Sequence, residues 1–251
     1  MITLERHDEI LELLKTKSPL SVKTLANKLF VSEATIRRDL ADLEKQSLLR
    51  RTHGGAVLIQ TEQEETGLSY RMSELTKEKE YIAEKTLPLI KNSKALFLDS
   101  SSTVAIMAKR IDMKFSTIVT TGIQTAVSVS QEENRRVILL GGTVSYSLNS
   151  VNGAMTLSQI RDFNFDTAVL SCAGIDETFN VTEKTVEQCA VKREVLKNSK
   201  VKILLADNTK FKVANISTIC SIKDFDYIVT DKKPSDEFIK FALNNGVKIL
   251  Y

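Results

Sequence analysis

Hydrophobic residues in the first sixty positions recur at the three- and four-residue spacing of amphipathic helices. This spacing predicts helices over residues 3–16, 21–29 and 32–45, with a short apolar turn between the second and the third. A β-hairpin is predicted over 48–58, where Gly54-Gly55 can take the positive φ angles of a tight turn. Helix, turn, helix and hairpin in this order indicate a winged helix-turn-helix.

The third predicted helix has one apolar and one polar face. Ser32 can cap its start, because its hydroxyl can accept from a free N–H of the first turn. Ile36, Leu40 and Leu43 share the apolar face. Small residues and two arginines occupy the other side, as expected of a helix that enters a major groove. The residues on that side and its flanks are Ala34, Thr35, Arg37, Arg38, Ala41 and Lys45.

These features predict a set of DNA-contacting side chains on the helix and on the wing. Guanidinium groups suit guanine edges and phosphates, and an exposed imidazole at the wing tip could contact phosphate or the minor groove. The alternative is an ordinary helical subdomain in which Arg38 pairs with Asp42 one turn later. The predicted DNA contacts are Ser32, Thr35, Arg37, Arg38, Arg51 and His53.

The pattern changes after the hairpin. Residues 59–73 are polar and acidic, which predicts a linker, although the apolar Leu68, Tyr70 and Met72 could dock on a domain. A helix is predicted over 74–90, and from there short β-rich runs alternate with helical segments. This alternation predicts a parallel sheet with helices on both faces. The strands are expected at 95–98, 117–119, 137–140, 167–170, 201–205, 227–229 and 247–250, and the helices at 104–111, 123–133, 154–161, 183–198 and 235–245.

The chain is therefore predicted to be an α/β protein. A winged helix-turn-helix domain is expected over residues 1–58, a linker over 59–73 and a larger Rossmann-like parallel-sheet domain over 74–251. The 251 residues and the 42% hydrophobic content allow a substantial core.

Charge is distributed unevenly along the chain. The net charge of +3 says little about nucleic acid, but residues 17–51 hold eight basic against four acidic residues, a balance that favours DNA binding. The acidic residues of the first helix should face away from DNA. The sequence shows no signal peptide and no apolar run of membrane-spanning length. Three cysteines without metal-like spacing fit a reduced cytoplasm, so a cytoplasmic protein is expected.

Two histidines cannot build a histidine-based metal site, and neither a metal nor a cofactor is predicted. His7 is expected on a helix surface, and His53 at the tip of the wing.

Polar or Gly-rich segments follow one predicted strand after another. In parallel sheets, ligands bind beyond the carboxyl ends of the strands, so these segments predict a site for an anion and its hydroxyl groups. Each segment also has a plainer explanation as a helix cap, a turn or a surface lysine. Glu183 and Lys192 are weaker candidates, because both are placed on one predicted helix without sharing a face. The candidates are Asp99, Ser100, Ser101, Ser102, Thr103, Thr121, Gly122, Gly141, Gly142, Asp176, Glu183, Asp207 and Lys210.

The segments Thr35–Glu44 (TIRRDLADLE) and Leu48–Leu58 (LLRRTHGGAVL) resemble the N-terminal signature of the DeoR family of bacterial transcription regulators. Five motifs of the second half resemble the DeoR-type sensor domain. They are LDSSST (Leu98–Thr103), VTTG (Val119–Gly122), LLGG (Leu139–Gly142), AGID (Ala173–Asp176) and ADNTKF (Ala206–Phe211).

The resemblance covers nearly the whole chain. It implies a sensor domain related in fold to ribose-phosphate isomerases and coenzyme A transferases, which senses phosphorylated sugars and on binding them weakens operator affinity. The sequence departs from the family pattern where Ser101 replaces a common glycine and Thr121 a common asparagine, and near Asn180, where glycine is common. These changes bear on which effector is bound.

The leading hypothesis is a DNA-binding repressor of sugar-metabolism genes that responds to a phosphorylated sugar. Its expected partners are double-stranded operator DNA, the phosphosugar and further copies of the chain, as a homodimer or higher homo-oligomer. One alternative is a sugar-phosphate isomerase with an appended DNA module, in which Asp99, Glu183 and Asp207 supply acid and base. Another is a ligand-independent architectural DNA binder.

Overall fold

The computed structural model describes residues 3–16, 18–46, 48–58, 67–113, 116–131 and 135–251. The chain divides into two compact units, an N-terminal unit (Met1–Arg71) and a C-terminal unit (Met72–Tyr251). Most of the predicted linker, residues 59–66, lies outside the described residues.

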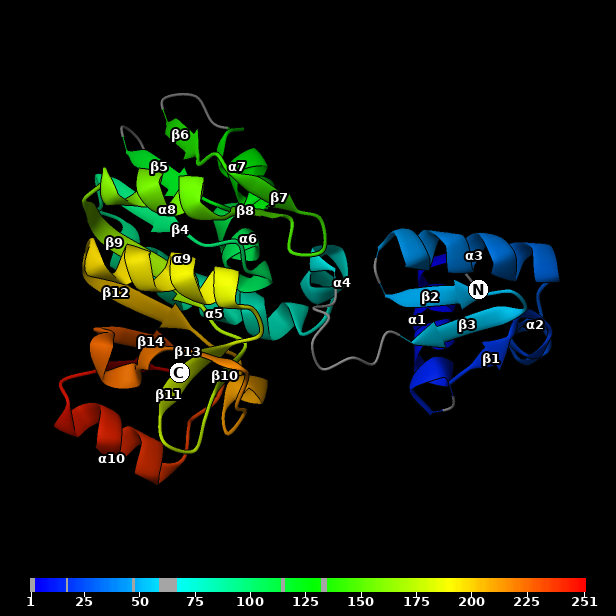
Figure 1. Cartoon of the computed structure of the whole chain (residues 1–251). Coiled ribbons are helices and arrows are strands. Elements are labelled where there is room, and N and C mark those ends of the chain that lie inside the picture. Colours follow the sequence, from blue (N-terminus) through cyan, green and yellow to red (C-terminus); the bar gives the residue numbers. More distant parts are fainter. Residues whose placement is uncertain (1–2, 17, 47, 59–66, 114–115, 132–134) are drawn as a thin grey trace. The chain divides into compact units, whose positions relative to one another are not determined.

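The N-terminal unit packs three helices against a small antiparallel sheet (Figure 1). The hydroxyls of Ser21 and Ser32 accept from backbone N–H groups of the first turn, so both shorter helices begin where polar caps precede apolar spacing. All three predicted helices and the hairpin are confirmed. The elements are α1 (Thr3–Thr16), β1 (Leu20–Ser21), α2 (Val22–Leu29), α3 (Glu33–Lys45), β2 (Leu49–Thr52) and β3 (Gly55–Leu58).

The apolar faces of these helices meet in one core. Ile36, Leu40 and Leu43 of α3 are almost completely buried, as their spacing predicts. They pack with residues of α1, α2 and the hairpin, among them Ile10 and Leu25. Helix α3, predicted to enter the major groove and called the recognition helix below, is thus fixed by its inner face, and its outer face is left for contacts.

The hairpin turn has a different physical basis from the one predicted. Neither Gly54 nor Gly55 has a positive φ. Instead, β1 pairs with β3 opposite Gly55, so that a Cβ there would lie 2.0 Å from the carbonyl oxygen of Leu20. Gly55 is needed for close approach of a third strand that the sequence pattern did not predict.

Helix α4 (Leu68–Ser73) occupies the end of the stretch that was predicted to be a linker. Leu68 is buried, and Tyr70 packs against the core of the N-terminal unit, so one of the apolar residues suspected of docking does dock there. The following helix, α5 (Thr76–Ile90), belongs to the C-terminal unit.

The C-terminal unit is built on a seven-stranded sheet with the order β15-β14-β12-β9-β4-β5-β6, in which all neighbours are parallel. Each of the seven predicted strands is one of its members, and an α/β fold is confirmed. The strands are β4 (Ala95–Leu98), β5 (Thr117–Thr120), β6 (Arg136–Leu139), β9 (Phe165–Ser171), β12 (Ser199–Leu205), β14 (Tyr227–Val229) and β15 (Lys248–Leu250).

Helices cover both faces of this sheet (Figure 1). Buried residues of α5 and α6 pack on one face with Leu96 and Leu98, whereas those of α8, α9 and α10 pack on the other with Phe97. Successive residues of β4 therefore point into opposite cores. The helices after α5 are α6 (Ser102–Ala108), α7 (Ile123–Val129), α8 (Ala154–Arg161), α9 (Val186–Lys197) and α10 (Asp236–Asn244), with 3-10 turns η1 (Asn208–Lys210) and η2 (Ile222–Asp224).

Among the described residues of the C-terminal unit, five short strands were not predicted from the sequence. They form a hairpin and a small antiparallel sheet with the order β10-β11-β13 beside the main sheet. Their runs are too short for a period to be recognised. One consequence is a correction: Glu183 ends a strand and does not lie on the helix predicted over 183–198, which begins at Val186. The strands are β7 (Thr143–Ser145), β8 (Ser150–Asn152), β10 (Gly174–Ile175), β11 (Asn180–Glu183) and β13 (Ser217–Ser221).

Candidate nucleic-acid interface and effector site

The start of helix α3 carries a closed polar cap. The Ser32 hydroxyl accepts from the Thr35 backbone N–H at 3.1 Å and lies 2.9 Å from the Thr35 hydroxyl. Both side chains were predicted to contact DNA, and both lie at the exposed end of the helix. Their hydroxyls are already engaged with each other, so their first role is to fix the helix start.

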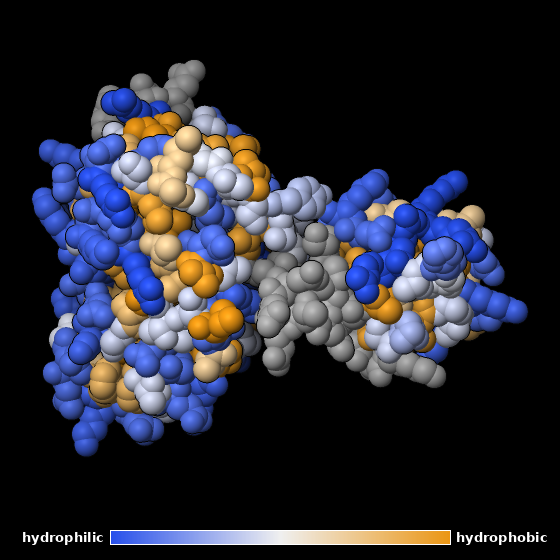
Figure 2. Space-filling model, viewed as in Figure 1, coloured by the Kyte–Doolittle hydropathy of each residue, from blue (hydrophilic) through white to orange (hydrophobic). Residues whose placement is uncertain are grey.

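The two arginines of α3 project from the exposed face. Arg37 forms an ion pair with Glu33 at 3.2 Å, but its side chain remains 60% exposed. Arg38 is exposed and makes no ion pair with any residue that the structure describes. Asp42 pairs with Lys45 instead, so the Arg38–Asp42 pair of the alternative reading is not formed. Figure 2 shows hydrophilic side chains gathered over α3.

The wing is tied to the recognition helix by Arg51. Its backbone N–H and its Nε donate to the two carboxylate oxygens of Glu44, at 2.8 and 2.7 Å. The backbone hydrogen bond from Arg51 first, and the side-chain bond second, lower the pKa of Glu44. Arg51, predicted as a DNA contact, thus holds the wing in place, while His53 is exposed at the turn. A hollow of about 400 Å³ between α3 and the wing is lined by Arg37, Arg51 and His53, among others.

A buried ion pair connects α1 to the recognition helix. Asp39, which is 3% exposed, accepts two hydrogen bonds from Arg6, at 2.6 and 2.9 Å, and lies 3.2 Å from His7 Nε2. The prediction that His7 lies on the surface is wrong, because its side chain is only 12% exposed and packs against this carboxylate. Asp39 faces the inside of the unit, so its charge is not part of the exposed face of α3.

At the carboxyl edge of the large sheet, Asp99 follows β4 and is 1% exposed. Its two oxygens accept from the backbone N–H groups of Ser101 and Ser171, at 2.9 and 2.7 Å. Lys192 of α9 lies 3.5 Å from the same carboxylate. The loop after β4 is therefore held against the end of β9, its neighbour in the sheet.

Lys192 and Glu183 form a fully buried ion pair, and Lys192 also donates to the Ser171 carbonyl at 2.8 Å. Burial alone would lower the pKa of Lys192, but the nearby carboxylates of Glu183 and Asp99 outweigh it and raise the pKa. Lys192 is thus a buried ammonium between two carboxylates. The hydrophobic pattern predicted one helix for both Glu183 and Lys192, which made them weak candidates for a shared site. In the structure a turn separates β11 from α9 and brings the two side chains together.

A neutral polar network adjoins this charged cluster. The amide of Gln188, on α9, lies 3.3 Å from the Ser100 hydroxyl, 3.0 Å from the Ser150 hydroxyl and 3.4 Å from Asn152 Oδ1. All four side chains are buried. Of these residues, only Ser100 was predicted for the site. The other three lie on β8 and α9, and the polar β8 is too short to stand out in the sequence.

The remaining predicted residues after β4, β5 and β6 take structural positions around this network. Ser101 caps α6 by accepting from the Val104 N–H at 3.3 Å, and Ser102, Thr103 and Thr121 are buried. A Cβ on Gly122 would lie 2.9 Å from the Ser100 Cα, so the glycine lets the loops after β4 and β5 touch. Gly141 and Gly142 are exposed after β6.

The loop after β12 carries two of the predicted site residues, Asp207 and Lys210. Asp207 is buried and accepts from both the backbone N–H and the hydroxyl of Thr209. Lys210 is half-buried; its backbone N–H donates to the Asp207 carbonyl at 3.0 Å, and its ammonium group makes no hydrogen bond or ion pair with another described residue. Charges of Asp207, Glu183, Lys192 and Lys210 all act on the thiol of Cys172, so these groups surround the end of β9.

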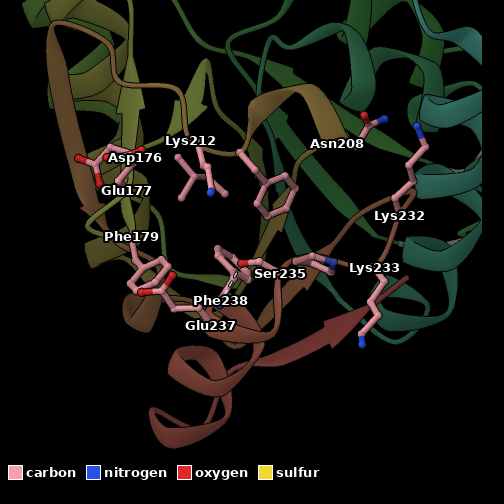
Figure 3. A pocket seen from close by; sticks show the side chains of 13 residues that line it. Asp176, Glu177, Phe179, Asn208, Lys212, Lys232, Lys233, Ser235, Glu237 and Phe238 are labelled. Atoms are coloured by element: carbon pink, nitrogen blue, oxygen red, sulfur yellow. Dashed lines mark hydrogen bonds between the residues drawn. The ribbon is translucent and has the colours of Figure 1, made fainter.

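Asp176, another predicted site residue, does not belong to this cluster. Its carboxylate accepts from the N–H and hydroxyl of Thr178 and from the N–H and amide of Asn180, which closes the turn between β10 and β11. It lines a separate cavity, shown in Figure 3. The motif AGID does not predict the short strand that follows Ala173 and places Asp176 at the β10–β11 turn.

Comparison with known proteins assigns both units. A family model described as the DeoR-like helix-turn-helix domain matches residues 6–62, and one described as the DeoR C terminal sensor domain matches residues 74–232. The chain belongs to the DeoR family. It is a DNA-binding transcription regulator, and the winged helix-turn-helix unit described above is its DNA-binding part.

Relatives of this DeoR-family regulator align along its whole length. It is 31% identical over 251 residues to the HTH-type transcriptional regulator GolR of Listeria innocua, covering 99% of this chain and 98% of the relative. It is 33% identical over 246 residues to the glycerol-3-phosphate regulon repressor of Escherichia coli, covering 98% and 97%. A solved ribose-5-phosphate isomerase aligns over 54% of each chain with 16% identity and a TM-score of 0.40, which is too low to support an inference about activity.

Among the described residues, no cluster of three or more histidine, cysteine, aspartate or glutamate side chains could hold a metal ion. The helices in the same ranges are either too short or too polar to cross a bilayer.

Proposed function

We propose that this DeoR-family regulator is a repressor of sugar-metabolism genes whose operator affinity falls when a phosphorylated sugar binds at the strand ends of the C-terminal unit. Support for the DNA-binding part comes from the exposed Arg37 and Arg38 on a helix whose opposite face is buried. Support for repression comes from relatives named as repressors, including the glycerol-3-phosphate regulon repressor and GlcR of Bacillus subtilis, 30% identical over 246 residues.

One observation carries the effector part of the proposal. Lys210 is half-buried beside a buried cluster of charges, and its ammonium group has no partner among the described residues. A lysine in such a place is well suited to hold a phosphate as a point charge. The carboxylates of Asp207 and Glu183, whose charges act on the same Cys172 thiol, are further acceptors for sugar hydroxyls. The hydroxyl-rich loop of Ser100–Thr103 follows Asp99 in the chain.

Coupling between the units requires that the phosphosugar bind the two states of the protein with different affinities, and the effect on DNA can be no larger than that difference. A homodimer would read two half-sites, so a change in the spacing of its two DNA-binding units would lower operator affinity. A factor of about 5 to 150 in affinity is typical of such coupling.

The test starts from a duplex that the full-length protein selects from a random-sequence DNA library. Its affinity is measured by fluorescence anisotropy with and without each member of a panel of sugar phosphates. We expect one of them to raise the Kd for DNA at least tenfold, and we expect Lys210→Ala to abolish that response while leaving effector-free DNA binding unchanged. If every sugar phosphate leaves both the Kd and the melting temperature unchanged, the effector part of the proposal fails.

The isomerase alternative receives less support from the side-chain geometry. Asp99 and Glu183 are both engaged with Lys192, and Asp207 with Thr209. A general base needs a carboxylate free to take a proton from the substrate. Turnover of ribose 5-phosphate by the purified protein would favour the enzyme instead.

A further inference from the structure

A cavity of about 530 Å³ lies in the C-terminal unit, where the β10–β11 turn, the segment after η1 and the start of α10 meet (Figure 3). Its lining residues are spread over three stretches, 175–179, 208–212 and 232–238, and Lys210 is not one of them. Of the predicted effector residues, only Asp176 lines it, so this cavity is distinct from the strand-end cluster around Lys192. Its volume falls within the range of small-molecule sites, about 300–1,000 Å³.

Three aromatic rings contribute to the apolar part of the lining, together with Ile175 and Pro234. Phe238 is 4% exposed, and the rings of Phe211 and Phe179 meet it edge-on, with centroids 5.0 and 5.7 Å away. Phe179 and Phe211 are half-buried, so both keep surface for a ligand. Such surfaces favour a flat ring, because aromatic pairs gain from stacked and edge-to-face contacts beyond their buried area.

The rim supplies charges of both signs, only part of which are already used. Lys233 pairs with Asp236 at 2.9 Å, and Asp176 is engaged in its own turn. Lys212 makes no ion pair with another described residue, and Figure 3 shows its side chain reaching toward the middle of the cavity. The same lack of a pair within the described chain holds for the other charged lining residues, Lys232, Glu177 and Glu237.

Two lining residues have a backbone conformation that side chains other than glycine rarely adopt. Phe179 has a φ of 63° and Lys212 a φ of 60°. Such strain persists where the surrounding structure enforces it, and it clusters at ligand sites. Here both strained residues face one cavity, and they contribute an aromatic ring and an unpaired ammonium group.

We propose that this cavity is a second ligand site, which binds a small organic phosphate with a flat ring, of the mononucleotide class. Phe179, Phe211 and Phe238 contact the ring. Lys212, whose side chain reaches toward the middle of the cavity, binds the phosphate. The carboxylates of Glu177 and Glu237 accept from hydroxyl or amino groups of the ligand.

Isothermal titration of the full chain with adenosine monophosphate tests the site, with inorganic phosphate and ribose 5-phosphate as probes that lack the ring. We expect adenosine monophosphate to bind at least tenfold more tightly than inorganic phosphate, and Lys212→Gly to weaken this binding at least tenfold. Glycine suits a φ of 60°, so the variant should melt at the same temperature as the natural chain or higher. Lys240→Ala removes an exposed lysine of α10 that does not line the cavity, and it should bind as the natural chain does.

The proposal is overturned if adenosine monophosphate does not bind, or if Lys212→Gly, still folded, binds it unchanged. It is also overturned if ribose 5-phosphate binds as tightly as adenosine monophosphate and Lys212→Gly weakens both equally, because the ring would then contribute nothing. Ribose 5-phosphate binding that Lys212→Gly leaves intact supports two separate sites.

Discussion

Glu183 at the end of β11 and Lys192 on α9 form an ion pair that is buried on both sides, with side-chain exposures of 5% each. Lys192 also lies 3.5 Å from Asp99, so one ammonium group balances two buried carboxylates from different parts of the fold. The loop after β4, the small antiparallel sheet and α9 are held together at this point.

Lys192→Met should destabilise the C-terminal unit more than Glu183→Gln does. The lysine variant leaves two buried carboxylates without their cation, whereas the glutamate variant leaves the lysine with Asp99. Removing one member of a buried pair costs about 3–5 kcal/mol. Urea denaturation measures both variants, and the double variant should lose less than the sum of the two. Equal small losses for both would show that the pair contributes little.

Arg38→Ala should lower DNA affinity with the C-terminal unit still folded. Loss of one arginine contact to a base edge costs about 1–3 kcal/mol, and loss of a phosphate contact reduces the salt dependence of binding by about one unit of slope. Anisotropy titrations at several salt concentrations separate the two cases. Lys240→Ala changes the net charge equally on the other unit and serves as the control. Unaltered DNA affinity in Arg38→Ala would remove this residue from the interface.

Gly55→Ala should destabilise the DNA-binding unit, whereas Gly54→Ala should not. A Cβ at position 55 would meet the Leu20 carbonyl oxygen at 2.0 Å, while nothing lies within 4 Å of a Cβ at position 54. Forcing atoms into a packed site costs about 1–3 kcal/mol. Calorimetry of the full chain compares the melting of the two variants. Equal behaviour of neighbouring glycines would contradict the close approach of β1.

Phe30→Asn should stabilise the DNA-binding unit. Phe30 ends α2 with a φ of 54° and is 94% exposed, so its ring buries almost nothing while the backbone is strained. Asparagine tolerates this conformation better, and the left-handed region costs most other residues roughly 1–2 kcal/mol. A rise in melting temperature of a few degrees is expected, since about 1 kcal/mol moves a small domain by roughly 4–8 °C. A lower melting temperature would mean that the ring has a packing role.

Stability should fall as the pH rises above about 9, through the buried thiols. Burial raises the pKa of Cys172 to about 12, from 9.0 for a free thiol. The folded chain therefore keeps a proton that the unfolded chain releases. The stabilisation is complete below pH 9 and is lost progressively up to about pH 12. Cys172→Ala should flatten this part of the pH profile in urea denaturation, and in the folded natural chain Cys172 should resist alkylation at pH 8. Rapid alkylation would contradict its burial.

The sequence pattern was sufficient to predict the helices of the N-terminal unit, the seven strands of the parallel sheet and the α/β class. These features depend on local spacing, as with Ile36, Leu40 and Leu43, and on caps such as Ser32, which act within one turn. The match of both halves to the DeoR family likewise rests on contiguous motifs.

The ion pairs between distant segments could be identified from the three-dimensional structure alone. The pairs are Arg51 with Glu44, Arg6 with Asp39, and Lys192 with Glu183. Asp176 lies in the turn between the short strands β10 and β11 and lines a separate cavity, instead of joining the cluster at the strand ends of the large sheet. Such pairings are set by the register and packing of segments that lie far apart in the chain. No local period of hydrophobic residues encodes them.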